Sequence, residues 1–455
     1  MSRIFLFSLN TCTHPCEVYP LGMAVVAAAL QRDGHEVCMY DYLVAGRNDG
    51  DLIAALQEYH PEFIGVSIRN LDDNIDSSYE IDNTKKFTWI SNLIEQIKNV
   101  TSVPVIIGGS AFSLMPETIL GIIKADYGIT GEGEKAICSL IKELQNQKRP
   151  DRIIYGSDYP ILGAEIKGGL YDKGLVRYYY EESDFISIQT KRGCPFQCVY
   201  CTYPSLEGHF FRYREIEEVI DDISRLKTEM GCNSFFFADS IFNDPAGRYR
   251  ELLEGIITKE LDIKWTAYFT PYRLEKSDIE LCKRAGLFAI ELGTDAACST
   301  TLAGLNKMFD WDDVVKANSI ITQADLPCAH FVIFGGPDET YETLEEGIQN
   351  CRRLENCVVF GYSGVRIYPG TLLFEHAMSE GIIEKNTSLL DPVYYHSPAI
   401  EKQRMHKMIC RGWGKDRRMI YPQAKAEKIS QVLKQMFNAK GLLWDKIHLL
   451  QRTRL

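Results

Sequence analysis

The sequence predicts an α/β protein that has a doubly wound parallel sheet, then an open partial barrel of six βα units, then a small, mainly helical C-terminal region. Two observations support this class. Short apolar runs alternate with amphipathic helical stretches, and the alternation stops once and then restarts. We therefore expect domain boundaries at residues 1–148, 149–184, 185–375 and 376–455.

The first series predicts a doubly wound, Rossmann-like domain. Its helix over residues 21–32 ends before Gly34, a residue that suits a helix C-terminus. The strands are expected at residues 3–9, 36–40, 63–68, 103–107 and 127–130, and further helices at 51–59, 86–98 and up to about 145. Such a sheet binds ligands at the carboxyl ends of its strands.

Residues 149–184 show little periodicity, so a linker is expected there. Six apolar runs then alternate with helices such as 216–230 and 278–285. The strands are expected at residues 185–189, 234–238, 263–268, 287–292, 329–334 and 357–366. Six units are too few for a closed eight-stranded barrel, and chemistry is expected where these strands end.

Three cysteines, Cys194, Cys198 and Cys201, follow the strand at residues 185–189 on one short loop. Three thiolates at this spacing can ligate three irons of an iron-sulfur cube and leave the fourth iron open. Two alternatives remain. One is three unrelated thiols, and the other is a zinc site, for which His209 is the nearest additional ligand and has no partner pair.

This loop, together with Tyr200 before the third cysteine, resembles the signature of the radical S-adenosylmethionine (SAM) superfamily. The resemblance implies a [4Fe-4S] cluster whose open iron chelates SAM. It also implies that one-electron reduction releases a 5′-deoxyadenosyl radical, and that Tyr200 lies near the adenine. The reductant would be a flavodoxin or a ferredoxin.

Polar groups and glycines at the later strand ends match positions at which this superfamily contacts SAM. The expected SAM-binding residues are Tyr200, Asp239, Asn243, Glu291, Thr294, Gly335, Gly336 and Tyr368. Each also has a structural interpretation. Asp239 could cap a helix, Glu291 could be a buried strand residue bonded to a backbone amide, and the glycines could form simple turns.

The loops of the first series resemble the cobalamin-binding-like domain that precedes many radical SAM barrels. The residues that carry this resemblance, and that we expect at a cobalamin site, are Tyr19, Gly22, Gly108, Gly109, Ser110, Gly131 and Glu132. The Asp-x-His-x-x-Gly pattern of cobalt-ligating domains is absent, and His14 is expected to be a solvated loop residue. Tight packing is the alternative reason for the glycines.

Composition disfavours two classes of protein, general nucleic-acid binders and secreted proteins. The net charge of −12 disfavours general nucleic-acid binding. The chain has fourteen cysteines, and its start is typical of a strand and not of a signal peptide. These features indicate reduced thiols in a cytoplasmic protein, and an oxygen-labile cluster fits an anaerobic cell.

The tail differs from the rest of the chain, because residues 401–455 carry fourteen Lys and Arg against four Asp and Glu. Residues 424–450 interleave lysines with large apolar side chains. Such a helix can lie on an anionic membrane surface, and the alternative is a helix packed on the barrel with its lysines in water.

The combined pattern resembles B12-binding-domain radical SAM proteins, including a lipid-biosynthesis subgroup. It implies cobalamin-dependent methylation of an unactivated carbon of a small molecule or lipid. One alternative keeps the radical chemistry for ring formation, coupling or rearrangement. A remote alternative is a non-catalytic iron-sulfur sensor. The sequence assigns no catalytic side chain.

Overall fold

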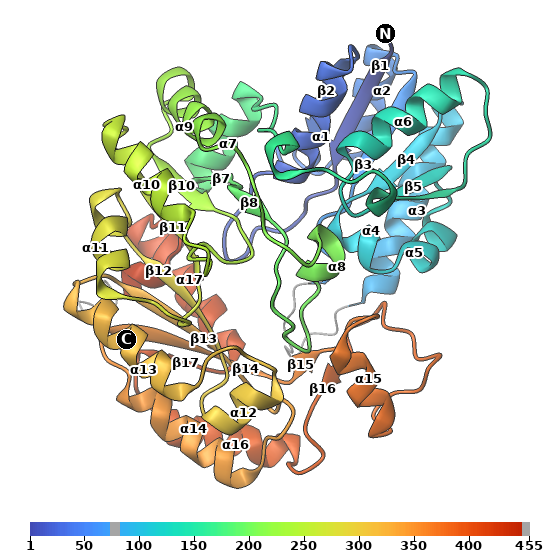
Figure 1. Cartoon of the computed structure of the whole chain (residues 1–455). Helices are drawn as coiled ribbons and strands as arrows, with labels where there is room; N and C mark the ends of the chain where they lie inside the picture. Colours follow the sequence, from blue (N-terminus) through green and yellow to red (C-terminus); the bar gives the residue numbers. More distant parts are fainter. Residues whose placement is uncertain (73–81, 448–455) are drawn as a thin grey trace.

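The computed structural model describes residues 1–72 and 82–447. Two parallel sheets, one in each half of the chain, lie beside each other with helices around them (Figure 1). Among the described helices none has the length and apolarity to cross a bilayer. The predicted fold class is confirmed.

The first sheet has the strand order β2-β1-β3-β4-β5-β6, and all of its pairs are parallel. Its strands are β1 (Arg3–Ser8), β2 (Glu36–Asp41), β3 (Phe63–Ser67), β4 (Val105–Gly108), β5 (Tyr127–Thr130) and β6 (Ile153–Tyr155). The helices are α1 (Leu21–Arg32), α2 (Asp49–Tyr59), α3 (Asn83–Val100), α4 (Ser110–Leu114), α5 (Pro116–Ile123) and α6 (Glu134–Gln145). Helices cover both faces, so the central strand β1 is apolar on both sides.

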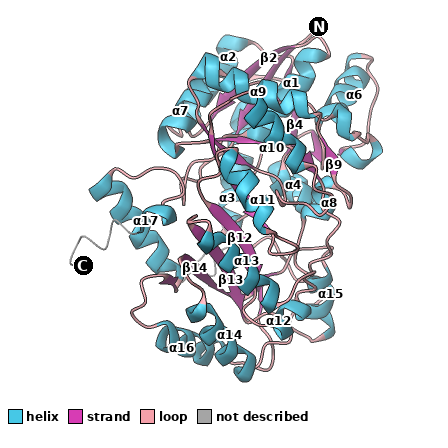
Figure 2. Cartoon of the chain, turned by 60° about the vertical axis from the view of Figure 1, so that its left-hand side comes forward, coloured by secondary structure: helices cyan, strands magenta, loops and turns pink. Residues whose placement is uncertain are grey.

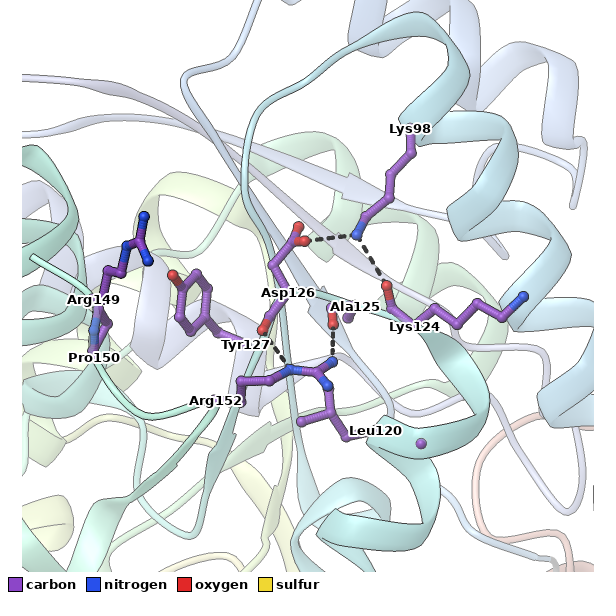
Figure 3. Close-up of a pocket in the computed structure, with 10 residues that line it drawn as sticks. Lys98, Leu120, Lys124, Ala125, Asp126, Tyr127, Arg149, Pro150 and Arg152 are labelled. Atoms are coloured by element: carbon purple, nitrogen blue, oxygen red, sulfur yellow. Dashed lines mark hydrogen bonds and ion pairs between the residues drawn. The ribbon is translucent and has the colours of Figure 1, made fainter. Parts of the chain in front are cut away.

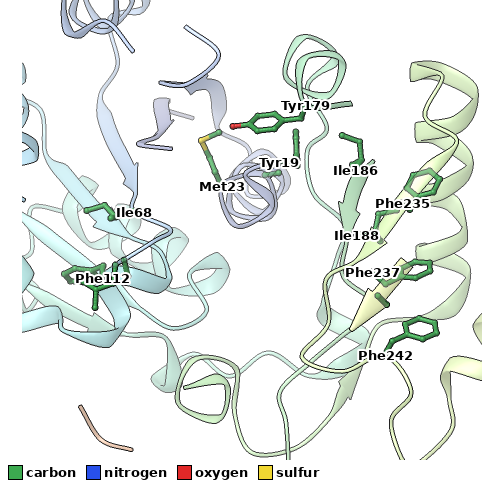
Figure 4. Packing of buried hydrophobic residues seen from close by; sticks show 14 of the residues in the cluster. Tyr19, Met23, Ile68, Phe112, Tyr179, Ile186, Ile188, Phe235, Phe237 and Phe242 are labelled. Carbon is green, nitrogen blue, oxygen red and sulfur yellow. The ribbon is translucent and has the colours of Figure 1, made fainter. Parts of the chain in front are cut away.

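The stretch expected to be a linker is ordered. It supplies β6 to the first sheet, two short 3-10 helices, η1 (Gly156–Asp158) and η2 (Gly163–Glu165), and α7 (Lys173–Ser183). The fully buried Tyr179 fastens α7 to the first sheet, since it donates to Asp41 at 3.1 Å and accepts from Asn10 at 2.9 Å. Figure 4 shows Tyr179 beside Tyr19 at this junction.

The second sheet has the order β17-β14-β13-β12-β11-β10-β7, again all parallel. Its strands are β7 (Ile186–Ile188), β10 (Ser234–Phe237), β11 (Lys264–Phe269), β12 (Ile290–Asp295), β13 (Cys328–Phe334), β14 (Cys357–Ser363) and β17 (Met419–Ile420). The helices around it are α9 (Ile216–Met230), α10 (Tyr249–Thr258), α11 (Lys276–Arg284), α12 (Ser299–Gly304), α13 (Trp311–Gln323) and α14 (Tyr341–Arg353). The six predicted strands are therefore present, and the barrel stays open (Figure 2).

Alternation along the barrel strands gives the sheet two different faces. Ile186 and Ile188 of β7 and Phe235 and Phe237 of β10 all point toward the helices (Figure 4). On the other face Tyr268 keeps 42% of its surface exposed, although both of its neighbours along β11 are buried. The inner face of the barrel thus keeps accessible aromatic surface.

The chain after β14 adds a strand to the barrel sheet and forms further helices. It comprises β15 (Val365–Arg366), α15 (Leu372–Ser379), β16 (Tyr394–Tyr395), α16 (Lys402–Trp413), β17 and α17 (Gln423–Phe437). The sequence did not predict β17, because a two-residue strand has no periodicity of its own. It pairs with Val359 and Phe360, so β14 is no longer an open edge.

The segment after α17 packs on the inner face of the barrel. Leu442, Leu443 and Trp444 are buried in one cluster with Phe236 of β10 and with Phe185, which precedes β7. These three side chains belong to the apolar set behind the expected membrane contact, and the barrel covers them, whereas Met436 of the same set is exposed. Leu449 and Leu450 lie outside the described residues.

A pair of substitutions distinguishes this packing from a membrane-bound tail. Leu443→Ala should lower the unfolding free energy of the barrel by about 2–4 kcal/mol, because the Leu443 side chain is 2% exposed. The control Met436→Ala, at a side chain 60% exposed, should change it by less than about 0.5 kcal/mol. Thermal unfolding without lipid measures both, and equal effects would contradict the packing.

Candidate active site

The three cysteines lie on one loop between β8 (Lys191–Arg192) and α8 (Tyr203–Glu207). β8 pairs with β9 (Arg212–Tyr213), which folds the loop back on itself. Gly193 has φ +84°, and a Cβ there would overlap the carbonyl oxygen of Phe210. Only glycine therefore allows this close return of the chain.

The thiols of Cys194 and Cys201 lie close enough to Cys198 for its charge to affect their pKa values. Burial raises the pKa of Cys194 and raises that of Cys201 to about 12, and the neighbouring Cys198 raises both further. Across the described residues, no three His, Cys, Asp or Glu side chains are grouped to hold a single metal ion. A cube spreads its thiolates over three irons, so this donor set fits a cluster, and the iron charge offsets the cost of deprotonation.

Asp239 fixes the residues that precede the cysteine loop. Its carboxylate is fully buried and accepts from the backbone amides of Thr190 and Lys191, the Thr190 hydroxyl and the Lys191 ammonium. These donors engage both oxygens, so Asp239 supports the start of the cysteine loop, and its expected contact with SAM stays a prediction. Asn243 is used similarly, since its amide bonds the backbone of Thr270 in both directions.

Glu291 lies on the inner face of the barrel, where Trp444 donates its indole N–H at 2.9 Å. Burial raises the pKa of Glu291 to about 7, the Trp444 bond opposes this rise, and the charge of Asp445 adds to it. The partner is thus an indole of the tail, and the expected backbone amide is not involved. Thr294 is buried and bonds the imidazole of His330 at 2.8 Å.

The glycine turn after β13 is held by a carboxylate. The amide of Gly335 donates to Glu339 at 2.9 Å, and Gly335 has φ +88°. Thr340 caps α14 by accepting from the amide of Thr343. A Cβ at Gly336 would lie 3.5 Å from the side chain of Leu305, an ordinary contact distance.

The expected cobalamin residues divide into two groups. Gly22, Gly108 and Gly131 are open, since a Cβ at any of them would meet no heavy atom closer than 3.5 Å. This space at the strand ends fits a bound group that needs close backbone approach.

The other four expected cobalamin residues make contacts within the protein, and their role at a cobalamin site stays a prediction. Tyr19 is buried and stacks on Tyr171, Gly109 presses against the backbone of Ile68, Ser110 donates to the carbonyl of Arg69, and Glu132 binds arginines. His14 is exposed, in line with a solvated loop residue.

Two arginines that sequence reasoning missed join the domains through three ion pairs. Arg192, next to the cysteine loop, binds Glu132 at 2.7 Å and Glu134 at 2.6 Å. Arg366, in β15, binds Asp72 at 2.9 Å. Glu132 and Asp72 follow strands of the first sheet, so these pairs join loops at the carboxyl ends of the two sheets.

Tyr368, an expected SAM-binding residue, and Arg212 also contact these loops. Tyr368 lies near Asp72, with its hydroxyl at 3.3 Å, and Arg212 binds the second oxygen of Glu132 at 2.7 Å. No sequence signal could have paired these residues, because up to 296 positions separate the partners.

A surface pocket of about 640 Å³ lies elsewhere, around Asp126 and Tyr127 at the start of β5 (Figure 3). Lys98 binds Asp126 within it at 2.7 Å. Because it faces the amino end of β5, it is separate from the junction that the ion pairs define.

Two family models match the chain. The B12 binding domain matches residues 11–141, and the Radical SAM superfamily matches residues 188–350. Together the two matches span well over half of the chain. The chain therefore belongs to the radical SAM proteins that carry a B12-binding domain, whose cofactors are a [4Fe-4S] cluster, SAM and cobalamin.

Individual relatives agree with this class. The tryptophan 2-C-methyltransferase of Streptomyces laurentii is 23% identical over 78% of this chain and 71% of its own length. An uncharacterized methyltransferase of Pyrococcus horikoshii is 25% identical over 82% of each chain. The solved structure of the methyltransferase TsrM from Kitasatospora setae covers 99% of both chains with a TM-score of 0.85 at 19% identity, which shows a shared fold.

The Arg192 ion pairs can be tested by substitution. Burial acts to raise the pKa of Glu134, but the charge and hydrogen bond of Arg192 hold that pKa below its ordinary value. Arg192→Met should therefore cost about 3–5 kcal/mol of stability, because it leaves the buried carboxylate of Glu134 without its arginine partner. It should also lower the iron content after reconstitution.

The matched control for this test is Arg177→Met. Arg177 pairs with Glu181 on the surface, where its side chain is 79% exposed, and its loss should change stability by less than about 1 kcal/mol. Thermal unfolding and iron analysis give both results. An Arg192 variant as stable as the control would contradict the proposed joining of the domains.

The raised pKa of Glu291 predicts a pH dependence of stability. The native state favours the neutral carboxyl, so it loses stability as the pH rises from the ordinary pKa of 4.5 to about 7. Glu291→Gln keeps an oxygen for Trp444 and should be more stable than the wild type at pH 8 by at most about 3 kcal/mol. The difference should vanish toward pH 5, and a difference independent of pH would contradict this prediction.

Proposed function

We propose that the chain is a cytoplasmic radical SAM methyltransferase that uses a [4Fe-4S] cluster, SAM and cobalamin to methylate an unactivated carbon of a small molecule or lipid. The observation that carries this proposal is the pairing of Arg192 with Glu132 and Glu134, because it joins the cysteine loop to a strand-end loop of the B12-binding domain. The cofactor regions of both domains thereby face one junction. When bound, the reduced cluster with SAM supplies a hydrogen-abstracting radical, and cobalamin supplies the methyl group.

The residues of the chain then have three tasks. Cys194, Cys198 and Cys201 would hold the cluster, with Asp239 fixing the strand end from which their loop starts. The open glycines of the first domain would let its backbone approach cobalamin. The inner barrel face, with Tyr268 and Glu291, would contact the substrate and exclude water from it.

The partners follow from this chemistry. The enzyme requires a one-electron reductant such as flavodoxin or ferredoxin, together with an organic substrate whose reacting carbon reaches the junction. Ring formation or rearrangement would use the same cluster without methyl transfer. Product mass separates the two reactions, because methyl-deuterated SAM labels the product only when its methyl group is transferred.

The first experiment is anaerobic expression with cobalamin, followed by iron, sulfide and cobalt analysis. We expect about four irons and roughly one cobalt per chain. Cys201→Ala should lose the iron and the SAM cleavage but keep the cobalt, because separate domains hold the two groups. Cys410→Ala, an exposed thiol on α16, should keep both. Four irons without cobalt after reconstitution would refute the methyltransferase proposal.

A further inference from the structure

The segment that follows α12 braces the cysteine loop. The amide of Val199 donates to the carbonyl of Leu305 at 3.2 Å, and the Asn306 side chain donates to the carbonyl of Gln197 at 2.7 Å. The next residue, Lys307, reaches the thiol between them, with its ammonium 3.4 Å from Sγ of Cys198. Three consecutive residues thus contact three consecutive residues of the loop.

The ammonium of Lys307 is enclosed. Its side chain is 10% exposed and forms an ion pair with Asp295 at the end of β12. The ring centroids of Tyr200 and Phe309 lie 5.9 Å and 5.4 Å from the ammonium. A lysine paired with a carboxylate in this way keeps its positive charge and has little freedom to move.

The charge of Lys307 lies directly beside the cysteine loop, since its ammonium donates to Sγ of Cys198. Hydrogen bonds to the ligand sulfurs and the net charge nearby set the reduction potential of an iron-sulfur cluster. Reduction adds one negative charge, so a fixed cation beside the sulfurs favours the reduced state.

We infer that Lys307 is a positioning residue that raises the reduction potential of the cluster by donating to Cys198, and that Asp295 holds the ammonium in place and limits the rise. This inference rests on the cluster assignment in the proposed function but not on methyl transfer. Neither residue was singled out by the sequence, because neither belongs to the cysteine motif.

The test is a redox titration of the reconstituted full-length protein, followed by electron paramagnetic resonance in the absence of SAM. Lys307→Gln removes the cation, and we expect about a tenfold lower ratio of reduced to oxidised cluster at a fixed solution potential. This change equals a shift of about 59 mV for one electron. Asp295→Asn removes the anion and should shift the potential in the opposite direction, while Lys307→Arg should stay near the wild type.

Both variants break the same ion pair, so a purely structural role would shift the potential in the same direction in both. Shifts of opposite sign therefore show an effect of charge. Equal potentials in all proteins, or shifts of Lys307→Gln and Asp295→Asn in one direction, would overturn the inference. If Lys307→Gln does not take up iron, the sign of the Asp295→Asn shift decides alone. Iron content and the cluster signal report separately on the cluster, so failure of the cluster assignment is distinguishable from failure of the inference.

Discussion

The ion pairs of Arg192 with Glu132 and Glu134 are the constraint on which the rest of the site depends. Arg192 immediately precedes Gly193 and Cys194, so the residue that fixes the domain junction also fixes the start of the cysteine loop. Buried ion pairs carry a large desolvation cost and add little net stability. Their value here is positional, because they bring the strand ends of two separate sheets to one place.

The polar groups around the cysteine loop follow one physical rule, that buried polar groups require partners. Asp239 is saturated by backbone and side-chain donors, and Glu339 holds the turn at Gly335. Both carboxylates shape loops and leave little capacity for a ligand. Glu291 differs, since Trp444 is its one hydrogen-bond partner among the described residues and burial favours its neutral form. Glu291 therefore keeps more hydrogen-bonding capacity than the other two carboxylates.

An open barrel leaves an edge and an inner face to be covered. β17 pairs with the edge of β14, and the segment around Leu443 covers part of the inner face. The basic tail is therefore a structural part of the barrel. One of its lysines also contacts the first domain, since the ammonium of Lys434 lies 3.7 Å from Oε2 of Glu17. The same segment places Trp444 beside Glu291, so the tail helps to shape the inner face of the barrel.

The sequence by itself determined the two βα series, the helix over Leu21–Arg32 and the three-cysteine loop, because periodicity and spacing are local properties. Only the tertiary structure decided that Asp239, Asn243, Tyr19 and Glu132 bond to the protein itself. Only the tertiary structure brought Arg192, Lys307 and Trp444 to the site. Their partners lie far away in the chain, and a side chain that could bind a ligand has the same sequence signal as one that binds a distant segment.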